Sequence, residues 1–570
     1  MEPETAARET TRPARVPKIL GADVEFGNFI DGLEIPSGSG GVASRLLLSA
    51  IEGIPAGATD PGRWSGSPST PASGPWPAHW PRPAIAEDED DTAGDGRYVS
   101  TAQDWGRRFL PGSGGCAYID LSHLELALPE TFSAFDHVAY WRAMLEIART
   151  AVTRVNDRLT AGRRVHALAN CSDGHGHSYG AHVNVLLTRA AWDTIIRRKP
   201  HVLAYLAAFQ VSSLVFTGAG KVGSENGQPW ADYQLSQRAD FIETSLGEQT
   251  TFNRPLVNAR DEALCGPLVR PVDGADSPEL ARLHVIFFDA TLCQVATLLR
   301  VGTLQIVIAM IEAGVVATGL ALDDPLDALQ RWSRDLSCSV RARLVAGGET
   351  TAVGLQERFL DQARRFADSH GFDGIVPRAA EILDLWEDTL RRLREGDFDT
   401  LSRRLDWVLK RQILERAMAS RPSLTWASPE IRHLDQLYAS VDDAEGLFWA
   451  SEQAGLVDVV VGEDEIRRAV HEPPDDTRAW TRTHLLRRAG ARRIQEVDWD
   501  RVGVRLDVRR HLLRSSPPRS VLLPCPFGAT RADREALFAA GRTLEDIVAD
   551  LQPETPATLA AAVPSTYTVC

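Results

Sequence analysis

Alternating apolar and polar side chains mark residues 114–130, GGCAYIDLSHLELALPE, as an extended segment. Successive side chains of a strand point to opposite faces, so Tyr118 and Asp120 are expected on one face and their apolar neighbours on the other. The segment then bends and presents a second carboxylate, Glu125. The pattern therefore predicts two strand-like pieces that carry acidic side chains.

Residues 18–27, KILGADVEFG, show the same alternation, with Asp23 and Glu25 two positions apart. Rigid strands that carry carboxylates suit a hard divalent cation such as Mg²⁺, which takes oxygen ligands and leaves positions for water and phosphate. The solvated faces of two edge strands would show the same pattern. The alternation alone leaves both interpretations open.

Two stretches have the character of core helices. Residues 132–159 repeat apolar positions at spacings of three and four, which predicts an amphipathic helix. Residues 301–322, VGTLQIVIAMIEAGVVATGLAL, form the most membrane-like stretch, but Glu312 and several glycines interrupt it. A buried helix in a large core, followed by a strand, is favoured over a membrane span.

Residues 53–96 differ from the rest of the chain because they are rich in proline, glycine, serine and alanine and end in an acidic run. Such a composition cannot form a packed core of its own. We expect a long mobile loop between the two carboxylate strands. Residues 1–16 are expected to be a disordered tail.

Composition narrows the class of protein. A net charge of −15 argues against non-specific binding to nucleic acid or to an anionic membrane. The seven cysteines are scattered without a CxxC pair, which fits a reducing compartment better than a disulfide framework or a zinc ribbon. The first residues lack an apolar core, so no secretion signal is expected and a cytoplasmic location is predicted.

Residues 171–189, CSDGHGHSYGAHVNVLLTR, place three histidines close together: His175, His177 and His182. A transition-metal cluster is one interpretation, but no cysteine or carboxylate stands at zinc-site spacing. A loop that contacts phosphate, or a simple turn, is favoured. Arg260 offers a planar guanidinium that can clamp phosphate or pair with a neighbouring carboxylate at the surface.

Taken in order, these blocks resemble the Pup ligase/depupylase family, and its depupylase branch most closely. The resemblance runs from about residue 18 to about residue 510. The blocks that carry it are GADVEFG at 21–27, YIDLSHLELALPE at 118–130, SYGAHVNVLLTR at 178–189, FTGAGKVG at 216–223, QLSQRADFIETSLGEQTTFNRPLVNARDE at 234–262, RLHVIFFDATLCQVATLLRVGT at 282–303, LDWVLKRQIL at 405–414, TWASPEIRHLDQLYASVDDAEGLFWA at 425–450 and EPPDDTRAWTR at 472–482.

The resemblance implies an α+β fold with a glutamine-synthetase-like architecture. A curved antiparallel sheet is expected to form a cradle, with helices packed behind it and a smaller C-terminal domain beside it. The expected divisions are a catalytic domain at 17–420, the small domain at 421–510 and an extension at 511–570. ATP, or ADP with phosphate, is expected in the cradle together with Mg²⁺.

The resemblance also implies an activity. Members of the depupylase branch hydrolyse an amide: they deamidate a C-terminal Gln of Pup, a small disordered prokaryotic ubiquitin-like protein, or cleave the isopeptide bond that Pup makes. The segment at 53–96 resembles the loop that marks this branch and favours hydrolase over ligase. An ATP-dependent Pup ligase, a carboxylate–amine ligase with another substrate, and a non-catalytic protein that binds a Pup-like tail stay open. Partners would be Pup or pupylated proteins, with an indirect link to the proteasome.

Residue roles follow from the same resemblance. Asp120 matches the catalytic aspartate, as nucleophile or general base, and either role suits a carboxylate near phosphate. The remaining expected site residues are Asp23, Glu25, Tyr118, Glu125 and His284 at metals, and His182, Asn184, Arg260 and Trp407 at the nucleotide. From its sequence pattern alone, Trp407 is equally a core tryptophan of a helix.

Several positions depart from the family pattern. Asp23 is one methylene shorter than the family's Glu, and Cys116 stands where an Arg would contact a nucleotide phosphate. Leu124, Leu128 and Val183 are further replacements. Several of these changes fall on the nucleotide side, and because Cys116 cannot provide the guanidinium contact, we expect nucleotide binding to be weaker than in relatives.

Overall fold

The computed structural model describes residues 15–31, 40–56, 105–265, 279–506 and 518–551. The loop expected at 53–96 lies almost wholly outside the described residues, as does the tail expected at 1–16. Of the extension expected at 511–570, only 518–551 is described.

One antiparallel sheet organises the main body of the protein. Its strands are β1 (Leu20–Ile30), β2 (Ile54–Pro55), β3 (Trp105–Phe109), β4 (Cys116–Asp120), β5 (His123–Ala127), β6 (Val165–Leu168), β7 (Val183–Thr188) and β12 (Leu280–Val285). They run in the order β12-β7-β1-β5-β4-β3-β2, and β6 pairs with β1 off this path. Because β1 pairs with β5, β6 and β7, it is a central strand, so the interpretation as an edge strand was wrong.

The remaining strands form small ribbons. They are β8 (Lys221–Val222), β9 (Tyr233–Gln234), β10 (Ile242–Gly247), β11 (Arg254–Asn258), β13 (Ala342–Arg343), β14 (Glu349–Thr350), β15 (Ile494–Asp498), β16 (Arg501–Val504) and β17 (Arg519–Leu522). The β10–β11 pair is parallel, and Arg254 of β11 lines the site described below.

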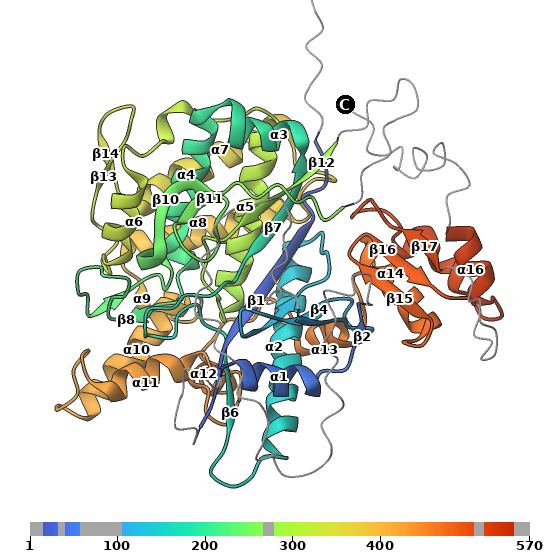
Figure 1. Ribbon diagram of the computed structural model, residues 1–570. Helices are drawn as coiled ribbons and strands as arrows, with labels where there is room; N and C mark the ends of the chain where they lie inside the picture. Colours follow the sequence, from blue (N-terminus) through green and yellow to red (C-terminus); the bar gives the residue numbers. More distant parts are fainter. Residues whose placement is uncertain (1–14, 32–39, 57–104, 266–278, 507–517, 552–570) are drawn as a thin grey trace, which may run out of the picture.

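Helices cover the sheet and build most of the core (Figure 1). They are α1 (Gly40–Ala50), α2 (Ala134–Asn156), α3 (Arg189–Asp193), α4 (Pro200–Thr217), α5 (Gln294–Glu312), α6 (Pro325–Ser333), α7 (Ala352–His370), α8 (Ala379–Glu395), α9 (Phe398–Leu401), α10 (Asp406–Ser420), α11 (Pro429–Tyr438), α12 (Leu447–Gln453), α13 (Glu463–His471), α14 (Arg478–Ala489), α15 (Arg531–Arg534) and α16 (Leu544–Leu551). The amphipathic helix expected at 132–159 is α2, and its side chains Val138, Leu145 and Val152 are buried as predicted.

Helices α4 and α5 are long and apolar enough to cross a membrane, but both pack inside the protein. Every residue of α5 is buried, which confirms the predicted core helix, although a short 3₁₀ turn at Thr318–Leu320 replaces the strand expected after it. Glu312 ends α5 and pairs with the buried ammonium of Lys18. It also accepts hydrogen bonds from the backbone N–H groups of Val16 (2.9 Å) and Thr188 (2.7 Å), so its charge is fully partnered inside the core.

The C-terminal residues form a second hydrophobic cluster, seen in Figure 1 as a small lobe beside the sheet. It contains Leu485 and Leu486 of α14, the core of β15–β17, and α16. The helices α11, α12 and α13 pack instead into the main core. The lobe therefore differs from the expected small domain at 421–510: it begins near α14 and takes in part of the expected extension, because the apolar faces of α11–α13 are already covered by the main body.

A buried ion network joins this lobe to the sheet. Glu130 follows β5, and its carboxylate accepts hydrogen bonds from Arg478 Nε (2.7 Å) and Arg482 Nη2 (2.7 Å), which lie one turn apart on α14. Thr477 Oγ1 donates to the Glu130 carbonyl at 2.8 Å. Burial alone would raise the pKa of Glu130, but the charges of Arg482 and Arg478 outweigh it and hold the pKa at about 2.

Glu130→Gln is expected to destabilise the protein by roughly 3–5 kcal/mol at neutral pH, because breaking a buried pair leaves two guanidinium charges without their carboxylate. The pKa is depressed from 4.5 to about 2, so the ionised form contributes stability above pH 4.5 that is lost as the pH falls towards 2. The difference in unfolding free energy between wild type and variant, measured with denaturant, should therefore narrow as the pH falls from 4.5 to about 2.

Glu52→Gln is the matched control. Glu52 is 88% exposed and lies 3.4 Å from Arg154, so its loss should cost less than about 1 kcal/mol. Equal destabilisation by the two variants at neutral pH would contradict a structural role for the Glu130 network.

Candidate functional site

A tight hairpin between β4 and β5 carries the first group of acidic residues. Tyr118 pairs with Glu125, and Asp120 pairs with His123 across a two-residue turn. Both turn residues are left-handed, with φ of 42° at Leu121 and 74° at Ser122. Positive φ at both central residues is typical of the type I′ turn, whose twist suits a two-residue hairpin. That turn prefers asparagine and glycine, whereas leucine and serine stand here. Asp120 is thus the last residue before a strained turn.

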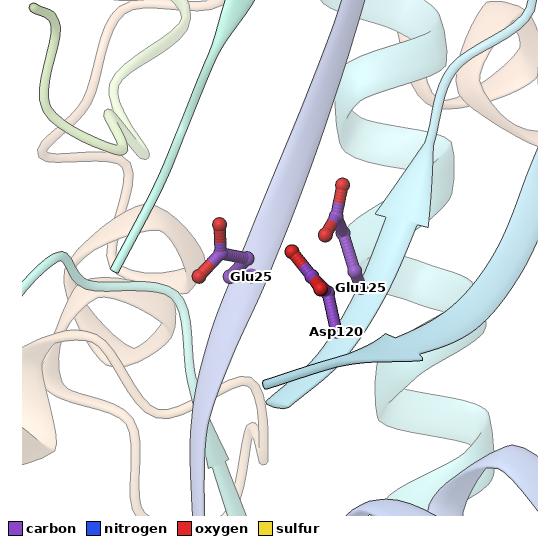
Figure 2. Close-up of side chains that lie close together, drawn as sticks. All are labelled: Glu25, Asp120 and Glu125. Atoms are coloured by element: carbon purple, nitrogen blue, oxygen red, sulfur yellow. The ribbon is translucent and has the colours of Figure 1, made fainter. Parts of the chain in front are cut away.

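The register between β1 and β5 brings the second acidic group to the first. Glu25 lies directly opposite Glu125, and Asp23 lies opposite Ala127. Figure 2 shows Glu25 of β1 beside Asp120 and Glu125 of the hairpin. One carboxylate oxygen from each of these three residues lies within 4.8 Å of the others. The register of β1 with β5 therefore brings the two acidic segments together.

These carboxylates line a pocket of about 530 Å³. The pocket holds every site residue expected from the sequence except Trp407: Asp23, Glu25, Tyr118, Asp120, Glu125, His182, Asn184, Arg260 and His284. Leu128, one of the departures from the family pattern, also lines it. Their placement in one pocket is shown, whereas the roles assigned to them stay predictions.

Crowded negative charge dominates this end of the pocket. Burial and the charges of Asp23, Asp120 and Glu25 raise the pKa of Glu125 well above its ordinary value. The Tyr118 hydroxyl donates a hydrogen bond to Glu125 Oε1 and offsets part of this effect. A divalent cation relieves such repulsion, and all-oxygen donors are what Mg²⁺ prefers. The donor set therefore fits a hard divalent metal.

Two histidines stand beside the carboxylates. His182 Nδ1 lies 2.8 Å from Asp23 Oδ1, and His284 Nδ1 lies 2.8 Å from Asn184 Oδ1. Burial and the positive charge of Arg282 lower the pKa of His284 well below its ordinary value, so this ring is neutral and able to act as a metal ligand.

Gly180 makes this arrangement possible. A Cβ atom at this position would lie 2.3 Å from His182 Nε2 and 2.8 Å from Glu25 Oε1. Real side-chain contacts do not approach so closely, so a larger residue would displace one of the two groups. The other histidines of the loop, His175 and His177, do not line the pocket, and His177 is 78% exposed and paired with Asp173. The zinc interpretation gains no support.

Arginines surround the rest of the pocket. Besides Arg260, the lining includes Arg107, Arg238, Arg254, Arg282 and Arg478. Burial, and the nearby charge of Arg238, lower the pKa of Arg254 to about 10, which leaves it charged at neutral pH. Guanidinium groups bind phosphate oxygens through paired hydrogen bonds. The sequence did not assign these five to the site, because they come from separated segments and only the fold brings them together.

Trp407 corrects the sequence-based assignment. Its indole is fully buried in α10, and Nε1 donates to the Val215 carbonyl at 2.9 Å. A ring enclosed in this way cannot stack on a ligand in the pocket, so the alternative reading as a core tryptophan holds. Cys116 is likewise fully buried in the cluster under the C-terminal lobe and does not line the pocket. Position 116 shares its strand face with Tyr118 and Asp120 and pairs with Ala127 of the pocket lining, so weaker nucleotide binding stays a prediction.

Known proteins share this sequence and this architecture. A depupylase of Acidothermus cellulolyticus is 33% identical over 536 residues, which cover 94% of this chain and 99% of that protein. A Pup–protein ligase of Acidimicrobium ferrooxidans is 35% identical over 442 residues, covering 75% of this chain and 90% of the ligase. A solved structure of the Pup ligase PafA in complex with ADP is 28% identical, with a TM-score of 0.63 over 76% of this chain and 89% of that one.

The likeness in structure confirms the predicted α+β, glutamine-synthetase-like fold class. The family described as Pup-ligase protein matches residues 19–503, which include both carboxylate strands, the arginines of the pocket and α14. With most of its length matched, and with the acidic cluster inside the matched region, the chain belongs to the Pup-ligase protein family.

Proposed function

We propose that this protein is a nucleotide- and Mg²⁺-dependent amide hydrolase that acts on the C-terminal residue of a Pup-like protein. It would deamidate a C-terminal Gln, or cleave the isopeptide bond between that residue and a lysine of a target protein. The observation that carries the proposal is the position of Asp120, at the tip of a tight hairpin and within 4.8 Å of two further carboxylates in a pocket lined by arginines.

A full-length alignment with a depupylase supports hydrolase over ligase. The match to the A. cellulolyticus depupylase takes in 94% of this chain and 99% of that protein. The segment at 53–96, whose composition resembles the loop that marks the depupylase branch, also favours the hydrolase.

The pocket supports binding of a nucleotide with its metal. PafA, a relative in this family, has been solved with ADP. Here the carboxylates of Glu25 and Glu125 would hold Mg²⁺, and the guanidinium groups of Arg254, Arg260 and Arg282 would hold phosphates. Bound Mg²⁺ neutralises phosphate charge and polarises an oxygen that it contacts.

Asp120 would perform the chemical step. Its carboxylate either attacks the amide carbon of the substrate, with release of ammonia or lysine and later hydrolysis of the mixed anhydride, or takes a proton from the water that attacks. Both routes consume one water for each amide bond cleaved. The neighbouring acids favour a metal-loaded site, because a cation offsets their mutual repulsion.

Ligation is the second candidate function. The A. ferrooxidans relative named as a Pup–protein ligase is 35% identical to this chain, and the same acids and arginines would serve transfer of a phosphate to a carboxylate. Stoichiometry separates the two functions. A ligase consumes ATP in proportion to the bond it forms, whereas the proposed hydrolase releases product without net consumption of nucleotide.

Asp120→Asn is expected to lower turnover at least ~10²-fold, the lower end for loss of a general base, because an amide neither attacks a carbonyl nor accepts a proton. Binding of the substrate tail should change little, since the variant keeps the size of the side chain. Release of ammonia from a Gln-terminated Pup-like peptide, measured at equal nucleotide concentration, checks this.

Asp384→Asn serves as the control because Asp384 is 71% exposed on α8 and far from the pocket lining. It should retain wild-type turnover. Near wild-type turnover by the Asp120 variant would remove this residue from the mechanism. A wild type that is inert on both amide substrates but joins a carboxylate to an amine would establish the ligase function instead.

Glu25→Gln should have opposite effects on stability without and with metal. In EDTA the substitution removes one of the repelling charges around Glu125, so the melting temperature should rise. With Mg²⁺ in large excess over Kd, the wild type should gain about 2.7 kcal/mol at one hundred times Kd. The variant should lose most of this gain. Thermal unfolding under both conditions gives the test, and equal Mg²⁺ stabilisation of the two proteins would exclude Glu25 as a ligand.

A further inference from the structure

The turn that carries Asp120 is strained. Leu121 and Ser122 both adopt left-handed backbone conformations, although neither is glycine. Such conformations persist only where surrounding contacts enforce them, and they concentrate at functional sites. The contacts that enforce this turn are therefore of interest for the chemistry at Asp120.

A buried polar chain reaches the turn from outside the pocket. The Ser44 hydroxyl, on α1, donates a hydrogen bond to the Ser122 carbonyl. It also accepts one from Asn28 Nδ2 of β1 at 2.7 Å, and Asn28 Oδ1 accepts one from the Leu124 backbone N–H at 3.1 Å. One amide and one hydroxyl thus hold the backbone on the C-terminal side of Asp120 at two points.

Burial makes these contacts specific. Ser44 is fully buried between Ala43 and Leu47 of α1, and Asn28 is 7% exposed. Polar groups in such surroundings are costly unless hydrogen-bonded, and a fully satisfied chain of them fixes one geometry. His123 holds the same turn from another side, with Nδ1 3.0 Å from the Phe26 carbonyl and its ring stacked on Tyr179.

We propose that Asn28 and Ser44 are positioning residues that hold the strained turn and thereby place the Asp120 carboxylate against the substrate amide. The proposal rests on the proposed function, in which Asp120 performs the chemical step. Asn28 and Ser44 act through the backbone of Ser122 and Leu124 and do not line the pocket.

Ser44→Ala should lower kcat by about 10- to 100-fold, the range expected when a reacting group is displaced by up to about an ångström. KM for the peptide and the affinity for nucleotide should stay within about twofold of wild type, because the pocket lining is intact. Ser49→Ala is the matched control, since Ser49 lies on the exposed face of the same helix and its hydroxyl donates within that helix, to the Leu46 carbonyl at 2.7 Å. The control should retain wild-type kcat.

Rescue separates positioning from a general loss of stability. Glycine tolerates the φ of 74° at Ser122 without strain and is the preferred residue at the second position of this turn class. Adding Ser122→Gly to Ser44→Ala should therefore raise kcat again by at least half of the loss in log kcat, which is about 3- to 10-fold for a loss of about 10- to 100-fold. A second variant, Asn28→Ala, should reproduce the loss of kcat and add little to Ser44→Ala, since both break one chain of contacts.

Hydrogen exchange makes the test independent of turnover. In the protein without substrate, Ser44→Ala should speed amide exchange across residues 118–127 and leave α2 unchanged. A kcat within twofold of wild type, a failed rescue, or unchanged exchange would each overturn the positioning role. If wild-type protein does not turn over amide substrates at all, the proposed function fails, while exchange still decides whether the turn is held by Ser44.

Discussion

Mutual repulsion among buried carboxylates is the constraint on which this structure depends. Glu25, Asp120 and Glu125 place oxygens within 4.8 Å of one another, and Asp23 adds its charge to the field that raises the pKa of Glu125. Without a cation this arrangement costs stability, so the surrounding fold has to hold the acids where they would not stay on their own. A central strand paired on both sides, a short hairpin and a ring of arginines provide that support.

The support is distributed over distant parts of the chain. The sheet fixes the spacing of the acids through the register of β1 with β5, which is independent of their charge. The C-terminal lobe closes one side of the pocket through Arg478, which binds Glu130 and donates to the Leu264 and Leu523 carbonyls at 2.7 and 2.9 Å. A single guanidinium therefore connects the sheet, the loop after β11 and the lobe. A substitution that disturbs any of the three contacts would also shift Arg478, which lines the pocket.

The sequence alone was sufficient for the two carboxylate strands, for the core helices α2 and α5, and for naming most residues that meet in the pocket, because alternation and helical spacing are local signals and the family blocks contain the acids. The sequence was insufficient wherever a residue's contacts are made by residues far away along the chain. Trp407 looked like a ligand residue by resemblance, yet only packing shows that α10 turns its indole into the core. Arg238 and Arg282 carry no local signal, and the boundary of the C-terminal lobe depends on which apolar faces the main body has already covered.

The central place of β1 has a consequence for synthesis. This strand leaves the ribosome first, and the last of its sheet partners, β7, follows after about 150 further residues, which takes roughly 8–30 s at ordinary rates of translation. Until its partners are made, Val24 and Phe26, which are fully buried in the finished protein, have no sheet to cover them. Asp23 and Glu25 alternate with them, and charges placed in this way oppose aggregation of an exposed strand. The charges that repel one another in the folded site are thus of the kind that keeps an unpaired strand soluble.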